Sequence, residues 1–264
     1  MGNCPCVPYG KKCMFEEHTK DLFCCCCHIL NYRMQELKMK LPFIGDWFDQ
    51  YVCKDFIDAA EEKGYSGIVV TNHFYHGNTA IDRNLPWKDF MSAYTKDYLE
   101  LKELGRKAGI TVFFGLEEGF APGREMLIYG LDPQVFVGSP EFIMMSAKEK
   151  SDFVHENSGL CVCAHPFRDR SYIPDPNTPP NPDLFDGIEG FNLFNQPEEN
   201  EKAFVFALNN KKFVTSGGDI HRAKDFSGAG IAFDTPVTEY KTFIEKLKSG
   251  DFKLLYPDKK LCGE

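Results

Sequence analysis

The chain has 264 residues, of which 43% are hydrophobic and 26% are charged. A chain of this size can bury one large core, and its alternating strand and helix patterns favour a single α/β domain. The formal net charge of -9 argues against nucleic acid as a partner, because nucleic-acid binders usually present a basic face.

The cysteines indicate a reducing environment. Eleven cysteines would suggest disulfides in a small secreted protein, but this chain is long and starts without an apolar signal segment. The consecutive residues Cys24 to Cys27 cannot all pair with one another under disulfide geometry, so we interpret them as free thiols. No apolar run is long enough for a transmembrane helix. We therefore expect a cytoplasmic protein.

The first residues allow one alternative location. Met1-Gly2-Asn3-Cys4 is compatible with a lipid anchor, but Cys6 stands where a myristoylation motif has Ser or Thr. N-terminal lipid anchoring is therefore kept only as the alternative.

From residue 54 onward, the spacing of apolar residues predicts alternating helices and strands. Gly64 and Gly109 are expected to end the first two helices. The expected helices are 54–63, 86–108, 146–156, 197–209 and 237–248. The expected strands are 67–71, 110–115, 124–130, 160–164, 187–191, 213–216 and 230–233. The stretch 174–182 holds five prolines, so we expect it to be a loop that walls or covers a site near His165.

Residue types that commonly bind metals follow several of these strands. Strands joined by helical crossovers run parallel, so their carboxyl ends meet at one rim of the sheet. Imidazoles and carboxylates gathered at such a rim can hold several metal ions. The chain therefore reads as a metallohydrolase. The residues are His73, Glu117, His165, Asp219 and His221.

Four motifs, in this order, resemble those of the PHP (polymerase and histidinol phosphatase) family. One motif alone is weak, but four in order are specific. The resemblance covers roughly residues 54 to 250. It implies a distorted (β/α)7 barrel, two or three divalent metal ions, and hydrolysis of phosphate esters. The motifs are Thr71-Asn72-His73, Gly115-Leu116-Glu117, Ala164-His165-Pro166-Phe167-Arg168 and Ser216-Gly217-Gly218-Asp219-Ile220-His221.

The resemblance assigns metal ligands by position. His73 matches the histidine of a Thr-Asp-His motif, with Asn72 in place of the aspartate. Glu117 matches a carboxylate that bridges metals, His165 a histidine before proline, and Asp219 with His221 the terminal pair. Glu125 stands where many members have a histidine, and a carboxylate can also serve as a ligand there.

The first family motif is altered. Members open with His-x-His-Thr at the end of the first strand, and the nearest match here is Glu16-Glu17-His18-Thr19. We therefore expect Glu16 and His18 as ligands and the first barrel strand at about 12–20, within an irregular, cysteine-rich segment 1–53. The remainder, 54–264, would complete the barrel. A zinc site at His28 and Cys24 to Cys27 is an alternative, although its spacing is unlike that of structural zinc sites.

These residues lead to a functional hypothesis. We expect a metal-dependent phosphoesterase that hydrolyses a small phosphorylated substrate with a metal-activated water, using zinc, manganese or iron. Asp219 and His221 would act in catalysis, and Arg168 would hold the phosphate, because a guanidinium can bind two of its oxygens. Arg168 could instead form a rim salt bridge, and Asp219 could cap a turn. Glu118 would replace Glu117 if the strand register shifted by one residue.

Two other functions remain compatible with the sequence. The altered first motif could leave a catalytically impaired barrel that only binds metal or ligand. A metallohydrolase of a substrate without phosphate is the second, because barrels with similar ligand sets also cleave amides.

Overall fold

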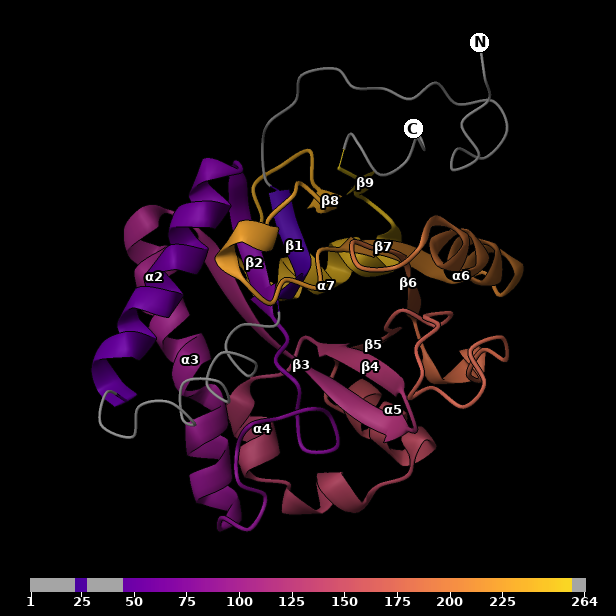
Figure 1. Cartoon of the computed structure of the whole chain (residues 1–264), viewed down its shortest axis with the longest axis horizontal. Helices are drawn as coiled ribbons and strands as arrows, with labels where there is room; N and C mark the ends of the chain where they lie inside the picture. The colour runs from indigo at the N-terminus through magenta and orange to yellow at the C-terminus, as the bar shows by residue number, and fades with distance from the viewer. Residues whose placement is uncertain (1–21, 28–44, 258–264) are drawn as a thin grey trace.

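The computed structural model of the protein describes residues 22–27 and 45–257 (Figure 1). The helices are α2 (Gly45–Glu62), α3 (Trp87–Ala108), α4 (Pro133–Val137), α5 (Ala147–Glu156), α6 (Pro197–Asn209) and α7 (Tyr240–Ser249). Short 3-10 helices cover Pro140–Met144, Pro182–Leu184 and Ala223–Asp225. The strands are β1 (Leu22–Cys27), β2 (Tyr65–Val70), β3 (Thr111–Ala121), β4 (Arg124–Tyr129), β5 (Leu160–Cys163), β6 (Gly187–Asn192), β7 (Phe213–Gly217), β8 (Gly230–Ala232) and β9 (Lys253–Leu255).

Within the described residues, the strands form one sheet in the order β7-β6-β5-β4-β3-β2-β1-β8-β9. Strands β1, β2 and β3 are parallel, and so are β5, β6 and β7. Strand β4 is antiparallel to both β3 and β5, so the two parallel groups point in the same direction. Their carboxyl ends therefore lie at one rim, as the sequence pattern predicts.

Strand β4 departs from the expected strand and helix alternation. Strand β3 runs to Ala121, beyond its expected end at residue 115, and the chain turns at Gly123, whose φ is 66°. A turn this tight cannot contain a crossover, so β3 and β4 form an antiparallel hairpin. The amino end of β4, with Glu125, therefore lies on the side of the sheet where its neighbours end.

The sheet curls into a distorted barrel. Strand β7, at one end of the strand order, contacts β1 and β8. Figure 1 shows the curled sheet with α2 and α3 on one side and α6 on another. The short antiparallel strands β8 and β9 continue the sheet beyond β1. The expected PHP-like α/β architecture is thus confirmed.

Alternate strand residues pack into two hydrophobic cores. Phe114 and Leu116 of β3 belong to a core that includes residues of α2, α3, α5 and α6. Phe113 of β3 and Leu127 of β4 belong to a second core, which includes Phe243 of α7. Because successive side chains of a strand point to opposite faces, α7 covers the face opposite to the other helices.

Local signals position several element ends as expected. Gly109 ends α3 with a φ of 76°, and Ser146 with Glu149 forms a capping box at the start of α5. Helix α2 begins at Gly45, earlier than the expected residue 54. No helix among the described residues has the length and apolarity needed to span a bilayer.

Candidate metal centre

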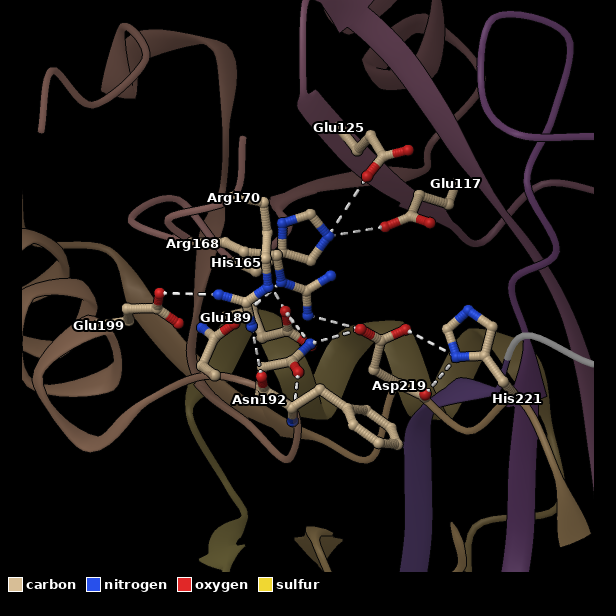
Figure 2. Close-up of polar contacts among 12 residues, drawn as sticks. Glu117, Glu125, His165, Arg168, Arg170, Glu189, Asn192, Glu199, Asp219 and His221 are labelled. Carbon is tan, nitrogen blue, oxygen red and sulfur yellow. Dashed lines mark hydrogen bonds and ion pairs between the residues drawn. The ribbon is translucent and has the colours of Figure 1, made fainter. Parts of the chain in front are cut away.

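The candidate site lies at the rim where the parallel strands end (Figure 2). His73 follows β2, Glu117 lies in β3, Glu125 near the start of β4, and His165 directly after β5. Alternation along the strands explains the side-chain directions. Glu117 shares the face of Phe113, and Glu125 shares the face of Leu127, so both carboxylates point to the face covered by α7. Glu118 points to the opposite face, as the register of β3 requires.

These four residues form a compact cluster. His73 Nδ1 lies 2.9 Å from one Glu117 oxygen and 3.3 Å from one Glu125 oxygen. His165 Nε2 lies 3.3 Å from the other oxygen of each carboxylate. Each carboxylate therefore presents one oxygen to each histidine. Carboxylates that hold two neighbouring metal ions have this arrangement.

Glu117 and His165 are buried, His73 and Glu125 are partly exposed, and their proximity shifts the pKa of His73, Glu125 and His165. Burial and Arg168 act to lower the pKa of His165, but Glu117 and Glu125 outweigh them and raise that pKa to about 9. Burial also opposes the charging of His73, yet the same carboxylates raise its pKa well above its usual value. Burial and Glu117 act to raise the pKa of Glu125, but His165 and His73 lower it overall. Two carboxylates this close together thus require nearby positive charge.

The donor set fits a divalent metal ion. Ligand atoms about 2.1 Å from a tetrahedral ion are about 3.4 Å apart, close to the separations within the cluster. One ligand atom from each of His73, Glu117 and Glu125 lies within 4.8 Å of the others. Mixed imidazole and carboxylate donors suit zinc, manganese and iron.

Asp219 and Arg168 form a second polar group beside the cluster. Arg168 Nη2 donates to Asp219 Oδ2 at 2.5 Å, and Arg168 Nε donates to Asn195 at 3.0 Å. Asn192 also donates to Asp219 Oδ2, at 3.2 Å (Figure 2). Asp219 is only 2% exposed, so its ion pair with Arg168 is buried. None of these contacts caps a turn.

His221 lies close to both Asp219 and His73. Its ring centroid is 6.3 Å from that of His73, and its side chain is 35% exposed. His221 Nδ1 lies 2.8 Å from the backbone oxygen of Asp219, which can only accept a hydrogen bond. Nδ1 is therefore the protonated nitrogen, and Nε2 carries the lone pair that a metal ion needs.

The backbone at two of these residues is unusual. His165 has a φ of 28° and Asp219 a φ of 47°. Residues other than glycine rarely adopt such positive φ values. Such conformations cost on the order of 1–3 kcal/mol and persist only where the surroundings enforce them. Glu189 contributes to this at His165 by accepting its backbone N–H at 2.9 Å.

Sequence reasoning missed three polar residues of the site. Glu189 is fully buried in β6 and also accepts from Asn192 at 3.0 Å, while Asn195 holds Arg168. A carboxylate among the apolar residues 187–191 was the available signal, because an unsatisfied buried charge is expensive. The asparagines gave no such signal.

The two ligands expected from the first motif lie outside the described residues. Glu16 and His18 precede β1, whose described bounds are Leu22–Cys27, and the strand expected at 12–20 also lies outside the described part of the chain. Among the described strands, β1 pairs in parallel with β2.

The fold defines a barrel of the PHP-like class, and comparison with known proteins agrees. No protein-family model matches the chain, and no curated protein matches its sequence. A two-domain protein from Bacteroides vulgatus, which contains a predicted PHP-like metal-dependent phosphoesterase, superposes with a TM-score of 0.61 at 14% identity. That match covers 95% of this chain and 71% of the other.

PsfC from Pseudomonas syringae superposes with a TM-score of 0.52, also at 14% identity, over 71% of this chain and 75% of PsfC. At such identities the likeness concerns the fold. It supports the PHP-like barrel that the motifs indicate.

Proposed function

We propose that the protein is a metal-dependent hydrolase of phosphate esters. The observation that carries the proposal is the convergence of His73, His165, Glu117 and Glu125, in which each carboxylate faces both imidazoles. The similarity to a structure described as containing a PHP-like metal-dependent phosphoesterase supports the same reaction class.

Six described residues would hold two or three divalent ions. The carboxylates of Glu117, Glu125 and Asp219 and the imidazoles of His73, His165 and His221 would supply the ligands. When bound, such ions neutralise phosphate charge and lower the pKa of water enough for it to attack near neutral pH.

The other residues of the site would position the substrate. Arg168 uses two of its five N–H donors on Asp219 and Asn195, so the guanidinium keeps donors for phosphate oxygens. The ion pair with Asp219 and the hydrogen bond to Asn195 would fix its direction. At 11% side-chain exposure, Arg168 acts where water screens charge weakly. A small phosphorylated molecule is the substrate class that this arrangement suits.

Metal content and phosphatase activity test the proposal together. Gently purified protein should contain zinc, manganese or iron by elemental analysis and should hydrolyse p-nitrophenyl phosphate with added Mn²⁺. The variant His165→Ala should lose both properties. His155→Ala is the matched control, because His155 lies on α5 and contacts Asp186. Metal-loaded protein that leaves phosphate esters intact but cleaves amide or lactone substrates would contradict the proposal.

A further inference from the structure

A second buried charge cluster lies next to the candidate metal centre, on the opposite face of β3. It consists of Glu118, Lys150 of α5 and His76 of the loop between β2 and α3. The side chains of Glu118 and Lys150 are 0% and 3% exposed, and Lys150 Nζ lies 2.5 Å from Glu118 Oε1. The Phe142 ring lies 5.5 Å from Lys150 Nζ. Nothing in the proposed reaction uses these groups.

Glu118 binds the loop through His76. One Glu118 oxygen accepts the backbone N–H of His76 at 3.1 Å, and the other lies 2.6 Å from the ring nitrogen Nδ1. Lys150 Nζ lies 3.3 Å from the same ring nitrogen. The His76 side chain itself is 44% exposed, so its buried contact is confined to this edge of the ring.

The same loop carries His73. Backbone hydrogen bonds join Phe74 to the Glu117 carbonyl at 2.7 Å and Glu117 to the Asn72 carbonyl at 3.1 Å. A turn then brings Gly77 back so close that a Cβ atom there would lie 3.0 Å from His73 Cβ. Segment 72–77 is therefore attached to β3 twice, by the backbone of Glu117 and by the side chain of Glu118.

We propose that Glu118, Lys150 and His76 form a positioning lock that sets His73 for cation binding. The inference rests on the proposed metal centre. Stability alone does not account for the cluster, because well-packed apolar residues usually stabilise a core as well as a buried ion pair does. A carboxylate supplies two acceptors that can fix both the backbone and the ring of His76, and Lys150 neutralises its charge. Neighbouring residues of β3 thus serve one site from two faces: Glu117 as ligand, Glu118 as support.

The variant His76→Ala tests the lock in the full-length protein. It keeps the Glu118–Lys150 pair, so the metal-free protein should keep its Tm within about 3 °C of wild type. Affinity for Zn²⁺, measured by competition with a chromogenic chelator, should fall about 10-fold or more, because partners that orient ligands typically contribute that much. His76→Asn should restore affinity to within about 3-fold, since its amide can donate to Glu118.

A double variant separates positioning from stability. Glu118→Leu with Lys150→Met removes both charges together, which avoids leaving one buried and unpaired. It should fold and show at least the Zn²⁺ affinity loss of His76→Ala, because it also removes the acceptor of the His76 backbone N–H, and adding His76→Ala should cause no further loss.

Two results would overturn the lock: wild-type Zn²⁺ affinity in His76→Ala, or losses that simply add in the triple variant. Both readouts are affinities. Failure of the lock is therefore distinguishable from failure of the proposed function, which would appear as Zn²⁺-loaded wild type without phosphatase activity.

Discussion

Glu117 and Glu125 lie on the same face of the β3–β4 hairpin and share two histidines between them. Glu117 pairs with Leu127 and Glu125 with Gly119, so the two carboxylates are diagonal neighbours across the strands. Like charges this close are unfavourable without a cation, and His73 and His165 supply that charge as protonated imidazoles. Under the proposed function, metal ions would take the place of these protons.

Replacement of Glu125, a proposed ligand, should lower the metal content without unfolding the protein. Glu125→Gln keeps the shape of the side chain but removes its negative charge, so we expect fewer bound ions per chain and a loss of phosphatase activity of about 100-fold. Elemental analysis and kinetics measure the two effects. Glu156→Gln, an exposed residue of α5, is the control with the same charge change. Wild-type metal content in Glu125→Gln would exclude this residue as a ligand.

The metal-free protein should become less stable as pH rises. The folded-state pKa of His165 is raised to about 9 and that of His73 lies well above 6.5, so both histidines hold protons that the unfolded chain has released. The stabilisation from each is complete below about pH 6.5; that of His165 is lost as pH rises through about 9, and that of His73 as pH rises through its raised pKa. Each histidine contributes a slope of up to about 1.4 kcal/mol per pH unit in that window.

Urea unfolding of the chelator-treated protein at several pH values measures this slope. His165→Gln removes one titrating group and should flatten it. A free energy of unfolding that stays constant or increases between pH 6.5 and 9 would contradict the interpretation.

The positions of the histidines were predictable because each follows a strand. Helical crossovers impose parallel strands, and parallel strands bring His73 and His165 to one rim whatever the details of packing. The choice of Glu117 over Glu118 came from the family resemblance and not from the pattern of the residues. Periodicity shows that the two point in opposite directions, but only the packed helices show which face is which.

Contacts between segments far apart in the chain could not be predicted from the sequence either. Lys150 is an ordinary helix residue by pattern, and only the packing of α5 on β3 gives it Glu118 as a partner. The hairpin of β3 and β4 could not be predicted, because the strand expected at 110–115 ends well before β3 does. The apolar run stops there, although pairing with β4 continues to Ala121.

Arg168→Lys should impair phosphate binding and leave metal content unchanged. Lysine keeps a positive charge near Asp219 but cannot reproduce both the contact with Asn195 and a two-oxygen grip on phosphate. We expect kcat/KM for p-nitrophenyl phosphate to fall 10- to 100-fold, about 1.4–3 kcal/mol. Arg222→Lys is the control, because Arg222 is exposed and pairs with Asp225. Unchanged kinetics in Arg168→Lys would restrict Arg168 to a structural ion pair.

Glu189→Leu should weaken metal binding, although it replaces none of the proposed ligands. Glu189 is buried, and its carboxylate accepts the backbone N–H of His165, whose φ of 28° needs support from its surroundings. Leucine fits the buried strand but leaves that N–H unsatisfied, at a cost of about 1–3 kcal/mol. Zn²⁺ affinity should fall because His165 is no longer held in place. Glu189→Gln still offers an amide oxygen to His165 and should retain most of the affinity. Equal Zn²⁺ affinity in both variants would show that His165 is positioned by its own strand and not by Glu189.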